Sequence, residues 1–281
     1  MKTIHFTKMH GIGNDYVYID CFKEKIDDPA EFSRLVSRQH FGIGSDGLIL
    51  ISPSEVADCK MNIFNADGSE AEMCGNGIRC VGKFLWDNGY VKEPKAQIET
   101  LCGVKTLELV ISGGQCTGAV VDMGEPVLAT KKIPAIFNED QVIGKPLIVG
   151  GKSYEVTLVS MGNPHCVTFT EEVEGLNLPA IGPLFEKHHV FPARTNTEFV
   201  KVIDSTHLRM RVWERGSEET FACGTGACAA TVASSLNGFT ERDVEIRLNG
   251  GTLRIRWDEE SNHVFLEGPA ETSFAGEYYI Y

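Results

Sequence analysis

Two stretches of the chain carry the same motif: GSEAEMCGNGIRC at residues 68–80 and GSEETFACGTGAC at residues 216–228. They lie 148 residues apart at Gly-Ser-Glu (68 to 216) and 149 residues apart at the cysteine (74 to 223). A repeat of this length is far longer than the ~20–50 residues of a solenoid unit. The motif therefore predicts a duplicated domain.

The two copies also match outside this motif. Asn14 stands ahead of a VYI run, and Asn163, 149 residues later, stands ahead of CVTF. Asp46 opens the apolar GLILI run, and its counterpart is taken to be Asn196, which opens TEFVKV at an offset of 150. Several matches in nearly one register make a chance similarity improbable.

Secondary-structure signals indicate a mixed fold. Short β-rich runs such as YVYID, KMNIFN, YEVTLV and HLRMRVW dominate, and turn residues separate them. Helices are predicted at 28–40, 75–88 and 224–237, and each of the last two starts after a Cys-Gly pair and stops at Asn-Gly. The predicted fold class is α+β, with two pseudo-symmetric domains that are each a curved, mostly antiparallel sheet around a central helix.

The domain boundary is expected at Glu125-Pro126. The first domain then spans residues 1–125 together with a C-terminal strand at about 269–281, and the second spans 126–268. Because ligand sites favour domain interfaces, the active site is expected in the cleft between the two domains.

Composition narrows the classes of partner and compartment. The net charge of -13 and the pI of about 5.1 speak against nucleic acid or an anionic membrane as a partner. Nine cysteines, an odd number without paired spacing, favour free thiols in a reducing compartment. No apolar run approaches the ~20 residues of a membrane helix, and the polar N-terminus leaves no room for a signal peptide. We therefore expect a cytoplasmic protein.

Cys74 and Cys223 occupy equivalent places at the starts of the two predicted helices. A helix N-terminus presents free N–H groups and a partial positive charge, which would lower a thiol pKa from ~8.5 towards neutrality and hold a carboxylate. With two such motifs across a cleft, one thiolate removes a substrate's α-proton while the opposite thiol delivers a proton to the other face. This chemistry inverts one carbon of a small amino-acid substrate and requires no cofactor.

A structural role and a metal-binding role are the alternatives for the cysteines of this chain. The remaining seven are expected to be buried structural residues, because free cysteine is among the most buried residue types. Cys74 and Cys80, and likewise Cys223 and Cys228, do not share a helix face, and no CxxC is present, so no metal site is expected.

Six motifs together make the chain resemble the diaminopimelate epimerases, a family of pyridoxal-phosphate-independent amino-acid epimerases. They are KMHGIGNDY at 8–16, GIGSDG at 42–47, FNADGSEAEMCGNGIRC at 64–80, MGNPHC at 161–166, RTNTEFV at 194–200 and RVWERGSEETFACGTGACA at 211–229. The resemblance implies a two-domain fold and epimerisation of LL- to meso-diaminopimelate, a step in making lysine and peptidoglycan precursors.

The resemblance also implies roles for individual residues. Cys74 and Cys223 are the two bases, and His165 and Glu214 tune the thiols. Gly75, Asn76, Gly224 and Thr225 form the carboxylate cradle at the reacting carbon. The distal amino-acid end is held by Asn14, Asn65, Asn163, Asn196, Glu214 and Arg215. The charges agree with this, since Arg215 suits a carboxylate and Glu214 suits an ammonium group.

The chain departs from the family's sequence pattern at two positions, and three other functions remain as alternatives. Gly47 stands where some members carry a glutamine that touches substrate, and Phe274 stands where some carry a tyrosine linked to dimer contacts, which weakens the expectation of a homodimer. The closest alternative is a racemase of proline or hydroxyproline with the same two thiols. An isomerase of the phenazine-biosynthesis type would be expected to lack the paired cysteines, and a binding protein would not need them.

Overall fold

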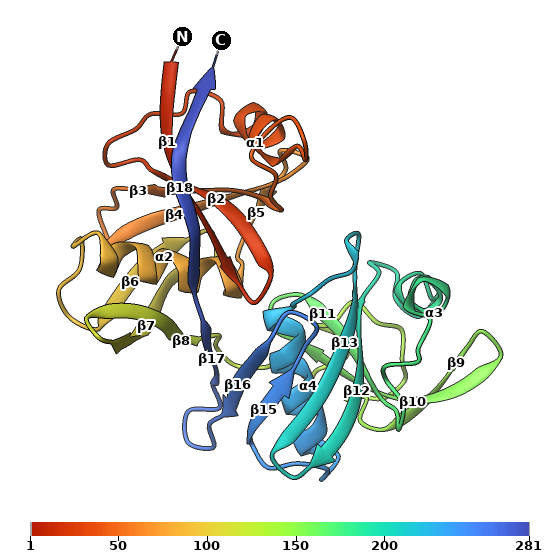
Figure 1. Cartoon of the computed structure of the whole chain (residues 1–281). Helices are drawn as coiled ribbons and strands as arrows, with labels where there is room; N and C mark the ends of the chain where they lie inside the picture. Colours follow the sequence, from red (N-terminus) through yellow and green to blue (C-terminus); the bar gives the residue numbers. More distant parts are fainter. Residues whose placement is uncertain (1, 281) are drawn as a thin grey trace. The chain divides into compact units, whose positions relative to one another are not determined.

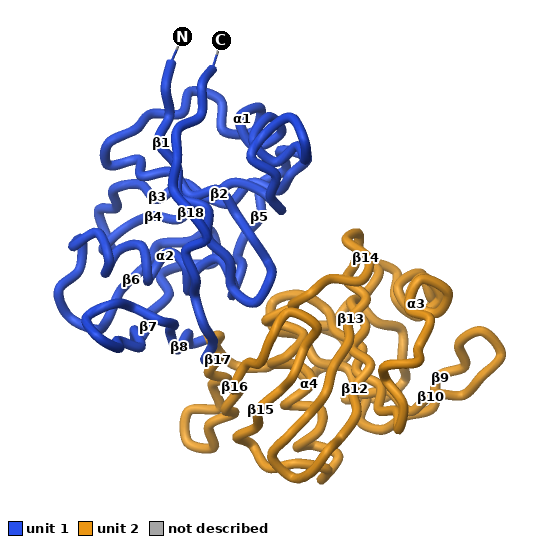
Figure 2. The backbone as a smooth tube through the Cα atoms, viewed as in Figure 1, with its two compact units in different colours: residues 1–122, 267–281 blue, residues 123–266 orange. Residues whose placement is uncertain are grey.

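In a computed structural model, which describes residues 2–280, the chain forms two compact units (Figures 1 and 2). Unit 1 comprises Met1–Asp122 and Glu267–Tyr281, and unit 2 comprises Met123–Leu266. Residue 281, the last of the C-terminal segment that the sequence places in the first domain, lies outside the described residues. The predicted α+β fold with two domains is confirmed.

The sheet of unit 1 has the strand order β18-β1-β2-β3-β4-β6-β7-β8. The pairs β2–β3 and β4–β6 are parallel and the other pairs are antiparallel. The strands are β1 (Lys2–Gly11), β2 (Asn14–Asp20), β3 (Gly47–Ser52), β4 (Cys59–Asn65), β6 (Lys95–Thr100), β7 (Gly103–Ser112), β8 (Gln115–Asp122) and β18 (Glu271–Ile280), and the short β5 (Glu70–Ala71) pairs with β4.

Helix α2 (Gly75–Asp87) is the central helix of unit 1 and packs against β1, β2, β6, β7 and β8. Its apolar residues recur at helical spacing, and Ile78, Val81 and Leu85 are fully buried. Cys74 caps its start, and Asn88 caps its end through hydrogen bonds to the last turn. A second helix, α1 (Pro29–Ser37), packs against β3 and β4.

Unit 2 repeats this plan. Its sheet has the order β9-β10-β11-β12-β13-β15-β16, with parallel pairs β11–β12 and β13–β15. Its elements are β9 (Lys145–Val149), β10 (Lys152–Ser160), β11 (Pro164–Phe169), α3 (Leu178–Glu186), β12 (Asn196–Asp204), β13 (His207–Glu214), β14 (Glu218–Glu219), α4 (Gly224–Leu236), β15 (Asp243–Arg247) and β16 (Thr252–Trp257), and β17 (Val264–Pro269) runs across the boundary into unit 1.

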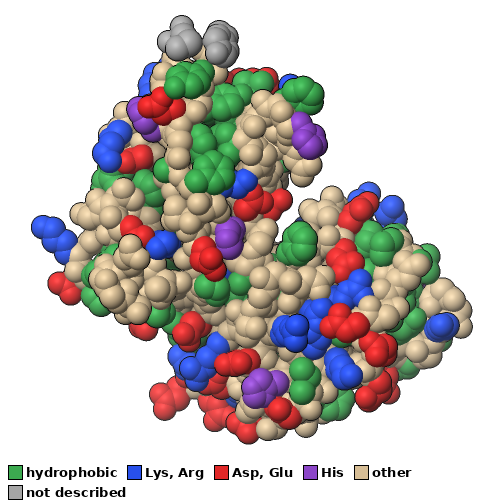
Figure 3. All heavy atoms as spheres, viewed as in Figure 1, with side chains coloured by type: hydrophobic (Ala, Val, Ile, Leu, Met, Phe, Trp, Pro, Cys, Tyr) green, Lys and Arg blue, Asp and Glu red, His purple; other side chains and the backbone are tan. Residues whose placement is uncertain are grey.

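Helix α4 takes the place of α2 and packs against β10, β11, β12, β15 and β16. Its buried residues include Ala227, Ala229, Ala230 and Ala233, whose small side chains let the helix backbone approach the sheet closely. Among the described helices, none combines the length and the apolar character that crossing a membrane requires. On the face shown in Figure 3, acidic and basic side chains are interspersed, in agreement with ion pairs such as Arg209–Glu174 and Arg254–Asp243.

Strand register corrects one detail of the repeat. In unit 1, Tyr16 on β2 pairs with Gly47 on β3, and in unit 2, His165 on β11 pairs with Asn196 on β12. The counterpart of Asn196 is therefore Gly47, and the match with Asp46 was wrong by one residue. Asp46 lies ahead of β3, where its carboxylate accepts hydrogen bonds from Asn14 and Asp15 at the start of β2.

Candidate active site

Cys74 is the N-cap residue of α2. Its extended backbone (φ -140°, ψ 112°) turns the side chain back over the first helical turn, so that Sγ accepts a hydrogen bond from the Gly77 N–H at 3.3 Å. Position 77 has no room for a side chain, because an added Cβ would lie 2.7 Å from Ile49 Cδ1. The helix start therefore brings the sulfur into contact with a backbone N–H group of the first helical turn.

Strand β2 supplies the polar neighbours of this thiol. Cys74 Sγ lies 3.3 Å from Asn14 Oδ1, and the Asn14 amide donates to Asp46 Oδ2 at 2.8 Å. The buried Tyr16 hydroxyl forms a hydrogen bond with the same sulfur. Tyr16 was not among the predicted site residues, because an aromatic residue in an apolar strand gives no functional signal in the sequence.

Two predicted residues of unit 1 are held by other protein groups. Asn76 is buried, and its Oδ1 accepts from Arg79 Nη2 at 3.1 Å, while Arg79 Nη1 donates to the Gly75 carbonyl at 2.9 Å. Asn65, at the end of β4, is half-buried and donates to Ser69 Oγ at 3.0 Å. The fully buried Arg79 was missed, although its place one turn after the cysteine puts a fixed positive charge near Cys74.

Cys223 is the equivalent N-cap of α4 and is almost fully buried, with 5% of its surface exposed. Its Sγ accepts from the Gly226 N–H at 3.4 Å and lies 3.6 Å from Thr225 Oγ1. A Cβ at position 226 would lie 2.7 Å from Glu198 Oε1. This helix start therefore has the same backbone as the first, but a carboxyl group stands where unit 1 has an isoleucine.

A chain of hydrogen bonds continues from Thr225 into the core of unit 2. Asn163 Nδ2 donates to Thr225 Oγ1 at 3.3 Å, and Asn163 Oδ1 lies 2.9 Å from His165 Nε2. The other ring nitrogen of His165, Nδ1, lies 2.7 Å from Glu198 Oε1, and both side chains are fully buried. Three predicted residues, Asn163, His165 and Thr225, are thus brought together, and Glu198 was missed.

The remaining predicted residues of unit 2 lie on and beside β13. Glu214, the half-buried last residue of β13, accepts a hydrogen bond from the Thr220 hydroxyl and forms another with Cys223. Asn196 is buried, and its Oδ1 accepts from the Arg215 backbone N–H at 2.8 Å. The Arg215 side chain is exposed and donates to the Ala193 carbonyl at 3.1 Å, so its guanidinium lies outside the buried cluster.

Burial sets the ionisation of both thiols, and it acts against the expected direction. Burial raises the pKa of Cys74, although N–H groups of Asn76 and Gly77, the Tyr16 hydroxyl and Arg79 oppose it. Burial raises the pKa of Cys223 well above its usual value, and the carboxylates of Glu214 and Glu198 add to the shift. The expectation of lowered thiol pKa values was therefore wrong, because the helix-start donors do not outweigh desolvation.

Burial also raises the pKa of the Glu214 carboxyl, while hydrogen bonds from Thr220 and Cys223 and the charge of His165 lower it. Two acidic groups and one histidine thus share a buried region with Cys223.

Five of the other seven cysteines are buried as expected, whereas Cys21 is half-buried and Cys102 is exposed, so the expectation was wrong for these two. Cys59, Cys80, Cys116, Cys166 and Cys228 are buried, and burial raises the pKa of Cys59 to about 12 and of Cys80 to about 11. Within residues 2–280 no group of three His, Cys, Asp or Glu side chains is arranged to hold a metal ion.

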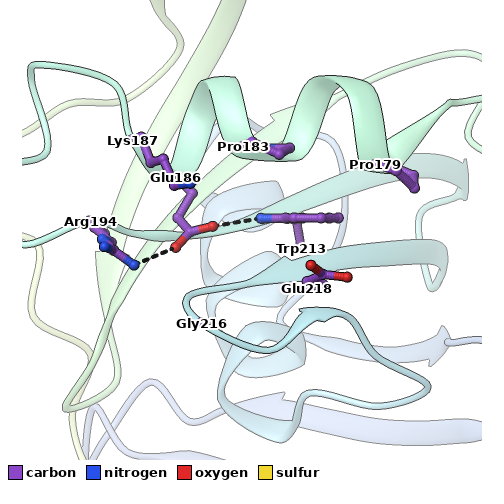
Figure 4. Close-up of a pocket in the computed structure, with 8 residues that line it drawn as sticks. All are labelled: Pro179, Pro183, Glu186, Lys187, Arg194, Trp213, Gly216 and Glu218. Atoms are coloured by element: carbon purple, nitrogen blue, oxygen red, sulfur yellow. Dashed lines mark hydrogen bonds and ion pairs between the residues drawn. The ribbon is translucent and has the colours of Figure 1, made fainter.

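A separate cavity of about 290 Å³ lies beside α3 in unit 2 (Figure 4). Glu186 spans part of it, bonding Trp213 Nε1 at 2.8 Å and Arg194 Nη1 at 3.4 Å. Its lining residues are Pro179, Pro183, Glu186, Lys187, Arg194, Trp213, Gly216 and Glu218, none of which is a predicted site residue.

Similarity to known proteins identifies the family of this chain. The model of the family described as diaminopimelate epimerase matches residues 6–129 and 157–273, which include both cysteine motifs. The chain belongs to the diaminopimelate epimerase family. Its relatives include the diaminopimelate epimerases of Desulfovibrio desulfuricans, 56% identical over 99% of both chains, and Acetivibrio thermocellus, 54% identical over 98% of both. The diaminopimelate epimerase of Methanococcus maripaludis is 53% identical over 97% of this chain and 98% of its own.

Solved structures with low identity share the fold of this epimerase family member. A phenazine biosynthesis protein of the PhzF family from Bacillus anthracis covers all of both chains with a TM-score of 0.68 at 16% identity. A hydroxyproline epimerase from Agrobacterium vitis covers 99% of this chain and 91% of its own, with a TM-score of 0.69 at 15% identity. At such identities the likeness concerns the fold alone, so the isomerase assignment rests on the family.

Proposed function

We propose that this chain catalyses the epimerisation of LL-2,6-diaminopimelate to meso-diaminopimelate, and the reverse reaction. The observation that carries the proposal is the pair of cysteines, each capping the central helix of its unit with the same backbone geometry. Membership of the diaminopimelate epimerase family supports the choice of substrate. Proline has no second amino-acid end, so its racemisation would leave the Glu214 carboxyl group and the Arg215 guanidinium without a substrate group to bind.

The proposed chemistry uses Cys74 and Cys223 as the two bases. One, as thiolate, removes the proton from the α-carbon, and the electron pair delocalises into the carboxylate. The other, as thiol, then gives its proton to the opposite face, which inverts the centre and leaves the two sulfurs with exchanged protonation states. Both thiols must reach one α-carbon in the working enzyme, and no pyridoxal phosphate takes part.

Backbone donors at the two helix starts are the proposed cradle for the reacting carboxylate. Residues Gly75 and Asn76 at one start, and Gly224 and Thr225 at the other, carry N–H groups in the first helical turn, where helical partners are absent. Such donors stabilise the enolate charge that develops as the proton leaves, the electrostatic contribution that is usually largest in this chemistry. His165 and Glu214 are proposed to tune the thiols.

The distal end of diaminopimelate carries a second carboxylate and ammonium group. We propose that six side chains hold it: Asn14, Asn65, Asn163, Asn196, Glu214 and Arg215. The exposed guanidinium of Arg215 is free to turn towards a carboxylate, because its one hydrogen bond is to a surface carbonyl. A substrate without these groups would leave buried polar atoms unpaired, which gives a basis for selectivity.

The proposed function includes a compartment, a class of partner and an assembly. We propose that the enzyme works in the cytoplasm, where it supplies meso-diaminopimelate for lysine and peptidoglycan precursors, and that it acts on a small molecule without nucleic acid or membrane. A homodimer is the proposed assembly. Sedimentation of the purified protein at several concentrations tests it, and a single species with the mass of one 30.9 kDa chain contradicts it.

The deciding experiment follows LL-diaminopimelate by proton NMR in D₂O with purified, reduced enzyme and no added cofactor. The expected result is loss of the α-proton signal at one centre and appearance of the meso isomer with deuterium at that carbon. A preparation with both thiols alkylated is the control and should be inert. If diaminopimelate is left unchanged while proline or hydroxyproline exchanges its α-proton, the proposal is wrong and the racemase alternative holds.

A further inference from the structure

Glu198 is a fully buried acidic residue outside the predicted site. It lies on β12 in unit 2, and its Oε1 is 2.7 Å from His165 Nδ1. Its other oxygen, Oε2, is buried without a hydrogen-bond partner in the described part of the chain. A buried carboxyl group with an unpaired oxygen lowers stability, so the packing of the unit does not account for its presence.

The repeat shows that the fold does not require a carboxyl group at this position. Strand register makes Tyr16 and His165 equivalent, and two residues after their partners on the next strand come Ile49 in unit 1 and Glu198 in unit 2. Both side chains approach the equivalent glycine of their central helix. An added Cβ would lie 2.7 Å from Ile49 Cδ1 at Gly77, and 2.7 Å from Glu198 Oε1 at Gly226. An apolar residue therefore serves the same structural place in unit 1.

The hydrogen bonds around His165 fix where its protons lie. The Asn163 amide group Nδ2 donates to Thr225 Oγ1, so Asn163 Oδ1 faces His165 and can only accept. His165 Nε2 must then carry a proton. The bond between Nδ1 and Glu198 contains one further proton, held either by the ring or by the carboxyl group, and the pair has no net charge in either state.

The same chain of hydrogen bonds reaches the thiol of Cys223. Thr225 Oγ1 accepts from Asn163 and lies 3.6 Å from Cys223 Sγ, so the threonine hydroxyl has its own proton to donate to the sulfur when that sulfur is a thiolate. Each donor in the series from His165 Nε2 onward points towards Cys223. If His165 changed to the tautomer with a bare Nε2, two acceptors would face each other and the series would break.

We propose that Glu198 is a positioning residue, whose carboxyl group holds His165 with a proton on Nε2 and, through Asn163 and Thr225, fixes the hydrogen bond that reaches Cys223. The kinetic consequence of this role rests on the proposed epimerase function. The placement of the proton on His165 does not, and it can be measured on the resting enzyme. At Cys74 the residue equivalent to His165 is Tyr16, and its hydroxyl bonds the sulfur directly.

Other titratable groups face the His165–Glu198 pair. Cys166 on β11 and Glu214 on β13 interact electrostatically with the pair, and so does Cys223 at the start of α4. Their protonation would change the apparent behaviour of His165 if only activity were followed against pH. Direct observation of the two ring nitrogens avoids this ambiguity.

The test compares Glu198→Ile, which copies the residue of unit 1, with Glu198→Gln, whose amide can still donate to Nδ1. Histidine-labelled ¹⁵N NMR between about pH 6 and 9 covers the range in which an ordinary histidine titrates. In the wild type, His165 Nε2 should stay protonated throughout. Glu198→Gln should keep the Nε2 proton and shift the Nδ1 resonance, and Glu198→Ile should populate the other tautomer.

Turnover supplies the second measurement. By analogy with the partners that orient metal-binding histidines, the rate of α-proton exchange should fall about 10- to 100-fold in Glu198→Ile. Glu198→Gln should recover most of it. Glu186→Gln is the matched control, because Glu186 is also a buried carboxyl group of unit 2 but bonds Trp213 and Arg194 (Figure 4). It should leave both the His165 resonances and the rate unchanged.

Wild-type ring resonances and rate in Glu198→Ile would overturn the proposal. If this variant does not fold, Glu198→Gln decides alone, since an unshifted Nδ1 resonance means that Glu198 does not bond that nitrogen. If the wild-type enzyme does not exchange the α-proton of diaminopimelate, the proposed function fails, and the NMR comparison still tests the role of Glu198.

Discussion

The two helix starts have the same backbone and different surroundings. At each, a cysteine N-cap in extended conformation accepts a hydrogen bond from the N–H three residues later, at 3.3 Å for Cys74 and 3.4 Å for Cys223. The thiol of unit 1 faces Asn14 and Tyr16, which carry no charge at neutral pH. The thiol of unit 2 faces two carboxyl groups and is connected to a histidine.

The difference separates what the fold supplies from what the neighbours supply. The sheet and central helix place a sulfur beside the backbone N–H groups of a helix start in both units, so the duplication alone provides two helix-capping thiols. The substitutions Tyr16 to His165, Ile49 to Glu198 and Asn65 to Glu214 between equivalent strand positions then make the two thiols unequal.

The largest expected effect comes from removing either sulfur. Cys74→Ala and Cys223→Ala should each reduce epimerisation by about 10⁴-fold or more, because a two-base reaction fails when one base is lost. The control is Cys102→Ala, which removes an exposed thiol and should retain full activity. Chiral chromatography of the products, with circular dichroism to confirm folding, measures the result. Substantial turnover by either alanine variant would contradict the assignment of two bases.

Much of this comparison was predictable from the sequence. The repeated GSE…CG motif identified both helix starts, because a cysteine before Gly-x-Gly and a helical pattern ending at Asn-Gly are local signals. The family and the α+β fold are confirmed. The residue roles stay predictions, now with Arg215 exposed and Asn76 held by Arg79.

Two features of the site could not be predicted from the sequence, for physical reasons. The direction of the thiol pKa shifts depends on burial, which is a property of the folded chain and not of the motif. Glu198 lies in an apolar run, TEFV, and its counterpart Ile49 became visible only when strand register corrected the alignment by one residue. A charged residue in one copy at a place that is apolar in the other would then have been a usable signal.

The next effect in size is on stability and concerns the paired glycines. Gly77→Ala and Gly226→Ala each place a Cβ 2.7 Å from a neighbouring side chain, so each should lower the free energy of unfolding by about 1–3 kcal/mol. Only Gly226→Ala presses on Glu198 and the Cys223 thiol, which lies 3.2 Å from the added atom. Urea denaturation measures the first effect, and His165 NMR resonances that shift in Gly226→Ala alone measure the second. Equal NMR shifts in both variants would show that the two surroundings are not distinct.

Position 47 shows how far the comparison extends. An added Cβ there would lie 2.2 Å from the Phe64 carbonyl and 2.9 Å from Tyr16 Cε1, whereas the equivalent position in unit 2 accommodates the buried Asn196. Unit 1 therefore has no side chain at the place where unit 2 has an amide.

A smaller effect is expected in the chemical reactivity of the two thiols. Cys74 is partly exposed and Cys223 is 5% exposed, and the carboxylates of Glu198 and Glu214 raise the pKa of Cys223 further. Iodoacetamide should therefore modify Cys74 first, by a factor that grows about tenfold for each unit between the two pKa values. Peptide mapping by mass spectrometry measures both rates. Faster modification of Cys223 would reverse the proposed order of acidity.

The smallest expected effect is a difference in alkaline stability between the variants that lack one thiol or the other. A raised thiol pKa in the folded state means that the folded protein keeps a proton that the unfolded chain releases above pH ~8.5. The stability associated with this group is therefore fully present below pH ~8.5 and declines as the pH rises towards the folded-state pKa. The decline is about 1.4 kcal/mol per pH unit for each thiol that stays protonated.

The alanine variants isolate this contribution at each helix start. Other buried thiols, such as Cys59 and Cys80, add the same alkaline loss to every variant, so they cancel in the comparison. Relative to wild type, Cys223→Ala should lose less stability than Cys74→Ala between about pH 8.5 and 10.5, because carboxylates strengthen the shift at Cys223 alone. Urea denaturation at each pH gives the slopes. Equal slopes in the two variants at every pH would mean that the folded-state pKa values of the two thiols do not differ.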